Sequence, residues 1–205
     1  MPRTGRPRTF DELETLARAR DVFWARGYAA TSVQDLVEEL TVQRGSLYGT
    51  FGDKRSLYLR AVSLYAQQNL WQLESLLAAD PILPTLRRML TRPATLTGAE
   101  PAEPRRGCLV GNTTAELVPE DADAQALVAA AYDGFVRVVA AAIRRAQAAG
   151  EVAATAEPEA VAQMILLLFQ GSALVSRAGA DSQRTNAAID AALAALPAAD
   201  ARPAR

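Results

Sequence analysis

Residues 27–57 have the sequence GYAATSVQDLVEELTVQRGSLYGTFGDKRSL, and this stretch decides the fold. Apolar side chains within it recur at spacings of three and four residues, which predicts a short helix over 33–40. Ser32 and Asp35 form an S-x-x-D capping box at the start of that helix. After three connecting residues, a second short helix is predicted over 44–50. Two short helices joined by so tight a turn are typical of a helix-turn-helix.

The sequence on both sides of this motif also indicates helices. Leu16, Ala19 and Phe23 share one face of a helix predicted over 10–26, which would pack behind the two short helices. Strand-type alternation is absent, and Ala and Leu dominate the later chain. Further helices are predicted over 54–78, 82–92, 107–117, 121–149, 157–178 and 182–196. The expected fold is all-α, with an N-terminal three-helix bundle that carries the helix-turn-helix and a larger helical domain after it.

The composition excludes many enzyme mechanisms. The chain has 205 residues, of which half are hydrophobic and 22% are charged, as in an ordinary globular protein. A single cysteine excludes an intrachain disulfide, and the absence of histidine removes the commonest general base and every histidine metal site. We therefore expect no cofactor and no metal. An enzyme that uses Asp or Glu is one rival class, although no paired carboxylate motif is present, and a module that binds another protein is a second.

The second short helix has a surface that packing does not explain. Its sequence, QRGSLY, contains only Leu47 as a deeply apolar residue, so the helix gains little from burial and its exposed face has another use. Gln43, Arg44 and Ser46 can reach base edges or phosphates. Gly45 would let the helix backbone come close to a sugar-phosphate edge. This composition indicates a recognition helix that lies in the major groove of DNA.

The distribution of charge supports the same interpretation. Residues 1–60 carry ten Lys or Arg and eight Asp or Glu, net +2, whereas the remainder carries twelve and fifteen, net −3. Arg3, Arg6 and Arg8 lie in a segment without acids, which either reaches DNA as a basic arm or is a disordered tail. The predicted divisions are a basic arm over 1–8, a DNA-binding domain over 9–56, a ligand-binding and dimerisation domain over 57–197 and a tail over 198–205.

The chain shows no sign of export or of membrane insertion. No apolar segment follows the first residues, so no secretory signal is predicted. The longest strongly apolar run, 164–169, has six residues, far fewer than a membrane span needs. We expect a cytoplasmic protein without a membrane partner.

Residues 16–57 resemble the DNA-binding domain of the TetR family of bacterial transcriptional repressors. The elements that carry the resemblance are Gly27-Tyr28, Thr31-Ser32, Gly45-x-Leu47-Tyr48, Phe51 and Lys54. Beyond this domain the chain resembles the family in its all-helical architecture. The segment RGCLVGNTTAEL at 106–117 also resembles the G-C-L-x-x-N segment of one branch of TetR-type regulators.

The resemblance implies roles for individual residues. A residue matching Thr31 or Ser32 caps the second helix and contacts a phosphate, Tyr48 contacts a phosphate through its hydroxyl, and Lys54 binds another. The expected DNA contacts are Thr31, Ser32, Gln43, Arg44, Gly45, Ser46, Tyr48 and Lys54.

Two positions depart from the family pattern. Gly49 and Thr50 replace a bulky residue and a histidine, which puts a base contact from position 49 in doubt and suggests a distinct operator. Thr41 stands in the turn where glycine is usual.

The resemblance further implies a homodimeric repressor that binds a palindromic operator of double-stranded DNA and is released by a small-molecule effector. Amphipathic helices over 157–178 and 182–196 would form a four-helix interface about a two-fold axis, unless one face packs on its own core. The expected dimer residues are Ile165, Leu168, Ser172, Val175, Ile189 and Leu193.

An effector pocket is expected among the later helices. A mostly apolar lining with few polar groups suits a lipophilic or aromatic effector. The candidate lining residues, each of which could instead be a core residue, are Trp71, Met89, Cys108, Asn112, Tyr132, Phe135 and Phe169.

Cys108 supports an alternative mechanism. It follows Arg105, Arg106 and Gly107 at a predicted helix start, where positive charge would favour the thiolate. Cys108 could therefore sense oxidants or electrophiles, or it could be a small buried hydrophobic residue.

Overall fold

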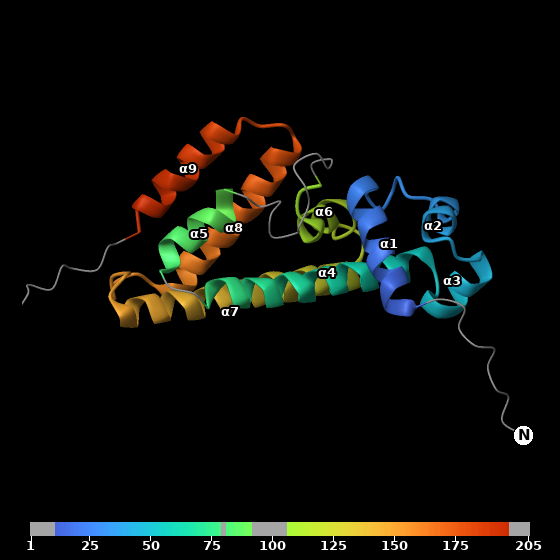
Figure 1. Cartoon of the computed structure of the whole chain (residues 1–205), viewed down its shortest axis with the longest axis horizontal. Coiled ribbons are helices and arrows are strands. Elements are labelled where there is room, and N and C mark those ends of the chain that lie inside the picture. The colour runs from blue at the N-terminus through green and yellow to red at the C-terminus, as the bar shows by residue number, and fades with distance from the viewer. Residues whose placement is uncertain (1–10, 79–80, 92–105, 197–205) are drawn as a thin grey trace, which may run out of the picture. The chain divides into compact units, whose positions relative to one another are not determined.

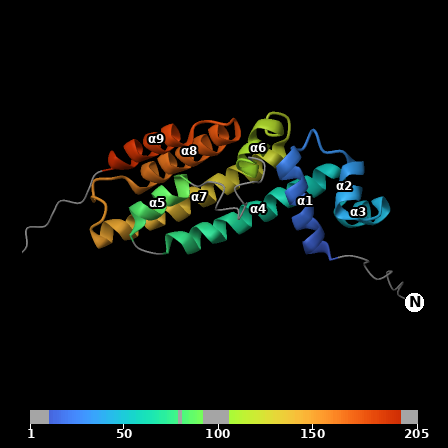
Figure 2. The same cartoon turned by 45° about the horizontal axis from the view of Figure 1, so that its top comes forward.

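The computed structural model describes residues 11–78, 81–91 and 106–196, and within them it contains nine helices and no strand. The all-α class is confirmed, and every predicted helix is present with its ends shifted by at most two residues (Figures 1 and 2). The helices are α1 Glu12–Arg26, α2 Val33–Leu40, α3 Arg44–Phe51, α4 Lys54–Leu77, α5 Ile82–Thr91, α6 Leu109–Glu116, α7 Ala122–Ala149, α8 Pro158–Arg177 and α9 Ser182–Ala194. The predicted arm over 1–8 and tail over 198–205 lie outside the described residues.

Capping side chains and glycines explain where the helices begin and end. Asp11 accepts hydrogen bonds from the backbone nitrogens of Leu13 and Glu14 at 2.8 and 3.0 Å, so α1 begins at residue 12 rather than at 10. Gly27, with φ of 87°, ends α1 at Arg26 as the sequence predicts. These ends fix the length of the helix against which α2 and α3 pack.

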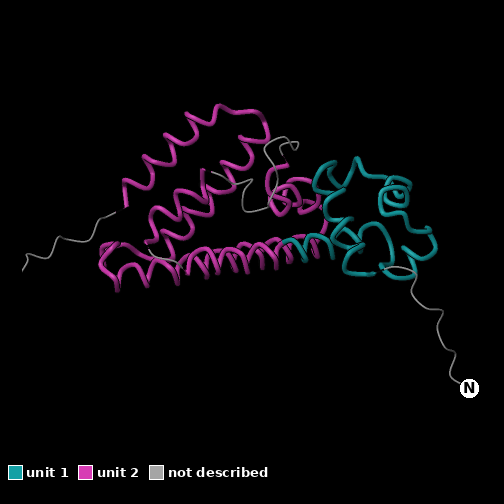
Figure 3. The backbone as a smooth tube through the Cα atoms, viewed as in Figure 1, with its two compact units in different colours: residues 1–65 teal, residues 66–205 magenta. Residues whose placement is uncertain are grey.

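Two compact units divide the chain after Tyr65, inside α4 (Figure 3). The first unit extends further than the predicted boundary at 56, because the first turns of α4 belong to its core. Tyr58 is fully buried, and its ring meets that of Phe23 edge-on with the centroids 5.0 Å apart. Tyr28 packs on the same ring at 4.8 Å. The first unit is thus a three-helix bundle closed by the start of α4.

The second unit is a helical domain in which α7 packs along α8 and α5 packs against α9 (Figure 2). Ile143 of α7 and Ile165 of α8 are fully buried in its core. Arg87 of α5 forms a two-pronged ion pair with Asp190 of α9, at 2.5 and 2.9 Å. By length and composition α7 and α8 could each cross a membrane, a property that core helices of soluble proteins share.

Burial corrects part of the predicted dimer face. Ile165, Ser172 and Ile189 are buried inside the chain, so they cannot meet a partner in this fold. Leu168 and Leu193 are half-buried, and Val175 is exposed. Apolar residues cover more than one face of α8, and of the four residues of this helix that the sequence predicts for the dimer face, Ile165 and Ser172 pack on the chain's own core.

Candidate nucleic-acid interface

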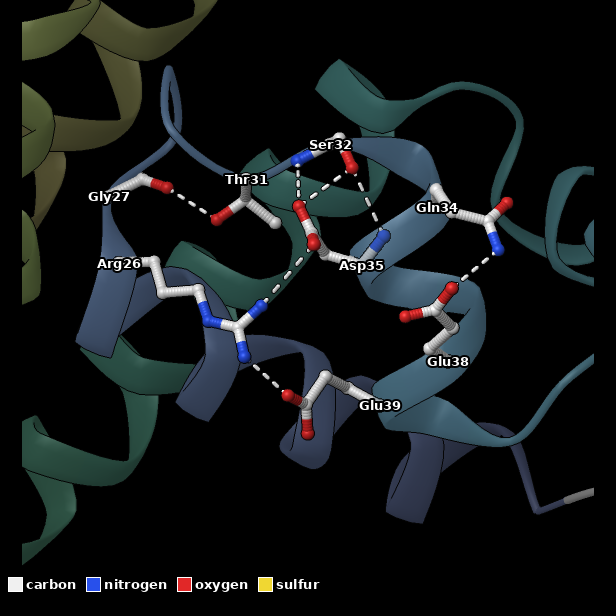
Figure 4. A network of polar contacts seen from close by, with 8 residues as sticks. All are labelled: Arg26, Gly27, Thr31, Ser32, Gln34, Asp35, Glu38 and Glu39. Carbon is white, nitrogen blue, oxygen red and sulfur yellow. Dashed lines mark hydrogen bonds and ion pairs between the residues drawn. The ribbon is translucent and has the colours of Figure 1, made fainter.

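The start of α2 is fixed by the capping box that the sequence predicts (Figure 4). Ser32 accepts a hydrogen bond from the backbone nitrogen of Asp35 at 3.1 Å, and the Asp35 carboxylate accepts from the Ser32 nitrogen and hydroxyl at 2.7 Å each. These bonds lower the pKa of Asp35 below its ordinary value of 3.8, the hydroxyl of Ser32 contributing most. Ser32 is exposed at the N-terminus of α2, where a helix favours a phosphate.

Thr31 is a correction to the predicted set of DNA contacts. It is fully buried, and its hydroxyl donates to the carbonyl of Gly27 at 2.6 Å (Figure 4). A side chain in that position holds the loop between α1 and α2 and cannot reach a phosphate. Of the Thr31-Ser32 pair, Ser32 alone caps α2 and faces solvent.

Ion pairs offset the acidic charge of α2. Arg26 at the end of α1 lies 3.6 Å from Asp35 and also pairs with Glu39 (Figure 4). Gln34 donates to Glu38 at 2.7 Å along the same helix. These acids would repel a phosphate backbone, and the charge of Arg26 reduces that repulsion beside α2.

Helix α3 is anchored on one side and bare on the other. Leu47 and Phe51 are buried, at 2% and 4% exposure, and hold α3 to the bundle. Gly45 and Gly49 lie on the opposite, solvent-facing side, and a Cβ built at either glycine would meet no atom within 4 Å. The outward face of α3 is therefore open backbone, flanked by polar side chains.

Arg44 and Tyr48 lie one turn apart at the edge of this bare face. The Arg44 guanidinium lies 5.7 Å from the centroid of the Tyr48 ring. Within the described residues the Arg44 side chain forms no hydrogen bond or ion pair, so its donors are available. Gln43, the N-cap residue of α3, is exposed and makes no side-chain capping bond, and Ser46 is half-buried.

Lys54 and Tyr48 line one shallow hollow where α2, α3 and α4 meet. The Lys54 ammonium lies 4.3 Å from the centroid of the Tyr28 ring, which holds the charge at the N-terminus of α4. Asp53 caps that helix by accepting from the Ser56 nitrogen at 2.7 Å, and this bond is the main reason that the pKa of Asp53 is lowered. Helix end, ammonium and phenol are each groups that can attract an anion or donate a hydrogen bond to one, and the Asp53 carboxylate lies beside them.

Arg18 and Arg60 join helices of the first unit through contacts that the sequence patterns missed. The Arg18 guanidinium donates to the carbonyls of Glu39 and Leu40 at the end of α2. Arg60 pairs with Glu12, and its guanidinium lies 4.8 Å from the centroid of the Phe51 ring at the end of α3. These contacts join residues far apart in the chain, so helical periodicity carries no signal for them.

The candidate effector residues of the second unit fall into two groups. The tilted rings of Phe135 and Phe169 are in contact with their centroids 5.6 Å apart, and the hydroxyl groups of Tyr132 and Thr114 share a hydrogen bond at 3.0 Å, so α6, α7 and α8 bring several candidates together. Burial raises the pKa of Tyr132. Trp71, by contrast, is 68% exposed on α4, which corrects its placement in an enclosed lining.

The remaining candidates of the second unit are engaged in packing or in local hydrogen bonds. Met89 is buried. Asn112 donates to the carbonyl of Arg106 at 3.0 Å. Cys108 is the N-cap residue of α6 rather than a residue of its first turn, is 7% exposed, and accepts a hydrogen bond from Gln170 at 3.5 Å.

A capped short helix, a tight turn and a second short helix with an open, polar outer face define a helix-turn-helix protein of the DNA-binding regulator class. Family comparisons agree with this class. Residues 16–61 match the model for bacterial regulatory proteins of the tetR family, and residues 83–192 match that of the tetracyclin repressor-like C-terminal domain. The chain belongs to the TetR family of bacterial transcriptional regulators.

Individual relatives share much of the chain. The transcriptional regulator AcuR of Cereibacter sphaeroides is 30% identical over 84% of this chain and 81% of its own length. The HTH-type regulator YezE of Bacillus subtilis is 35% identical, over 57% of this chain and 60% of its own. A cysteine mutant of the TetR-family regulator CifR, solved with 26-base-pair operator DNA, superposes with a TM-score of 0.79 and 29% identity, over 94% of this chain and all of that one.

The capping box makes the stability of the first unit sensitive to acid. Asp35 has a lowered pKa in the folded state, so its contribution to stability is complete above 3.8 and is lost as the pH falls through the folded-state value. Asp35→Asn should lower the urea midpoint at pH 7. The difference in urea midpoint between the variant and the wild type should disappear as the pH falls below about 4. A gap that stays constant down to pH 2.5 would contradict this role of the carboxylate.

Proposed function

We propose that this protein is a homodimeric, ligand-responsive repressor that binds a palindromic operator through α3 and releases it when a small molecule binds the second unit. The observation that carries the proposal is the outer face of α3, where Arg44 keeps its donors available beside two glycines with open space above them. Such a face contributes no packing that stabilises the fold, and it suits insertion into a major groove.

The exposed side chains divide into two kinds of contact. Ser32, Tyr48 and Lys54 would bind phosphates and set the register of the helix on the duplex. Gln43 and Arg44 would reach base edges, and an arginine pairs best with guanine. Gly45 and Ser46 complete the edge that approaches the backbone. Because bacterial operator DNA lies in the cytoplasm, we propose a cytoplasmic location for a protein that binds it.

Exposed apolar residues on α8 support dimerisation. Leu167, Leu174 and Val175 are 64%, 68% and 40% exposed and lie at helical spacing around the exposed Gly171. Isolated exposed leucines need no explanation, but a stripe along one helix suits burial against a second copy. The proposed interface therefore uses the face of α8 that carries Leu167 and Leu174.

The effector is proposed to bind where α6, α7 and α8 meet, near the paired rings of Phe135 and Phe169. Aromatic walls with the Tyr132 hydroxyl as a polar anchor suit a small lipophilic or aromatic molecule. Modification of Cys108 is the alternative means of release. The burial of Cys108 and its bond from Gln170 favour a packing role over rapid reaction with oxidants.

Substitutions at α3 and α4 test DNA binding. The probe is a duplex that the wild-type protein selects from a randomised pool. Arg44→Ala should weaken its binding by about 1–3 kcal/mol and relax base preference at one position. Lys54→Ala should weaken binding to selected and random duplexes alike. Because a dimer loses two phosphate contacts, the slope of log K on log salt should become shallower by about 2.

Arg184→Ala serves as the matched control, because Arg184 lies on α9 and is 90% exposed. It should change neither base preference nor the salt slope. Unchanged affinity in Arg44→Ala would remove Arg44 from the interface, and selection of no sequence at all by the wild type would overturn the proposed function.

Gly49→Ala should change the stability of the fold and the affinity for DNA in opposite directions. Alanine is favoured over glycine inside a helix by about 0.5–1 kcal/mol, and the space above Gly49 is open, so the variant should unfold at higher urea. The added methyl group should at the same time weaken binding to the selected duplex, since it holds the α3 backbone away from the groove. Equal or tighter binding would show that Gly49 does not face DNA.

Leu174→Asp tests the dimer. A charge on the α8 stripe should convert a dimeric wild type into monomers in sedimentation velocity at micromolar concentration, and operator binding should fall because each monomer makes half the contacts. Leu13→Asp is the control, because Leu13 is an equally exposed leucine, at 64%, on α1. Dimers that survive Leu174→Asp would place the interface elsewhere.

A further inference from the structure

The C-terminus of α2 forms a Schellman motif. A helix leaves its last four carbonyl groups without donors from its own backbone. The nitrogen of Val42 donates to the carbonyl of Val37, and the nitrogen of Thr41 donates to that of Glu38, both at 3.3 Å. These two bonds satisfy two of the four carbonyls and reverse the chain direction within the turn.

Arg18 of α1 satisfies the other two carbonyls. Its guanidinium donates from one nitrogen to Leu40 at 3.3 Å and from the other to Glu39. The planar fork of arginine can reach two acceptors at once, whereas a lysine ammonium is a single point of charge. The positive charge also lies at the negative end of the α2 dipole, where it is favourable. One side chain from α1 therefore completes the end of α2.

The residue after this end has an unfavourable backbone conformation. Thr41 has φ of 57° and ψ of 38°, in the left-handed region, and it is the sole non-glycine residue with positive φ among the residues that the structure describes. Glycine is usual at this position of a Schellman motif, and a β-branched residue is strained there. Contacts outside the turn must therefore keep Thr41 in place.

We propose that Arg18 is a positioning residue for DNA recognition. By binding the last two carbonyls of α2, it keeps Thr41 in the left-handed conformation and so fixes the direction in which α3 leaves the turn. The inference rests on the proposed function of α3 as the recognition helix. In this proposal Arg18 acts through the turn: the two carbonyls engage one donor on each terminal nitrogen of its guanidinium, and the salt dependence of binding tests whether the remaining donors contact a phosphate.

The shortness of the turn makes α3 depend on Thr41. Val42 follows at once and is buried, at 8% exposure, and Gln43 is already the N-cap residue of α3. If Thr41 relaxes to negative φ, the Schellman bonds break and the path from α2 to α3 changes. The anchoring of Leu47 keeps α3 near the bundle, so the expected effect is a change in its direction rather than its loss.

A double-mutant cycle at Arg18 and Thr41 tests the inference. With the selected duplex as probe, Arg18→Ala should lower affinity about tenfold, the size expected when charge-assisted hydrogen bonds are lost. The slope of log K on log salt should not change, since no phosphate contact is removed. Thr41→Gly should restore affinity in the Arg18→Ala background to within about twofold, because glycine adopts the left-handed conformation without strain.

Two control variants make the result decisive. Arg20→Ala removes the same charge from α1, where Arg20 pairs with its neighbour Asp21, and should leave affinity unchanged. Arg18→Lys should give an intermediate loss, which keeps the test readable if Arg18→Ala folds poorly. A shallower salt slope in Arg18→Ala, or failure of Thr41→Gly to rescue binding, would overturn the inference.

Urea unfolding of the wild type, Arg18→Ala, Thr41→Gly and the double variant tests the same coupling without DNA. The loss of stability caused by Arg18→Ala should be smaller when residue 41 is glycine. Additive effects would overturn the coupling between Arg18 and Thr41. If the wild type selects no duplex, the proposed function fails, while the unfolding cycle still decides whether Arg18 holds the turn.

Discussion

Helices of eight residues do not hold themselves together in water, and the first unit contains two of them, α2 and α3. Isolated helices of that length are marginal because nucleation is unfavourable and most terminal backbone groups have no partner. The unit meets this constraint at the helix ends. Ser32 and Asp35 close the start of α2, and Arg18 closes its end together with the Schellman bonds. Only after these groups are satisfied can a helix as poorly buried as α3 be presented to a ligand.

The arginines of the first unit illustrate how charge is divided between structure and recognition. Arg26 is engaged by acids of α2, Arg18 by backbone carbonyls, and Arg60 by Glu12. Arg44, on the outer face of α3, has its guanidinium over an aromatic ring and no acidic partner in the described chain. A net charge near zero thus coexists with a locally available cation, which is why overall composition carried so weak a signal for nucleic acid.

Helical periodicity and capping chemistry predicted the all-α fold, each helix and the Ser32 cap, because these depend on residues close together in the chain. The same chemistry could not separate Ser32 from Thr31, since both are hydroxyl residues at a helix start and only the packed loop shows which one is buried. On α8 apolar residues cover more than one face, so spacing could not tell the core side with Ile165 from the open side with Leu174. Arg18 was missed because it acts across 22 residues of sequence, and no local pattern records such a contact.

The two glycines on the outer face of α3 have a consequence for altering specificity. A recognition surface is usually hard to redesign, because the side chains that read DNA also support their own helix. Here the fold makes no demand at positions 45 and 49, where new side chains would extend into unoccupied space from a helix anchored by Leu47 and Phe51. If α3 is the recognition helix, positions 45 and 49, one turn apart, are two sites at which a new side chain would exchange the close approach of the backbone for contacts of its own, at no cost in packing to the fold.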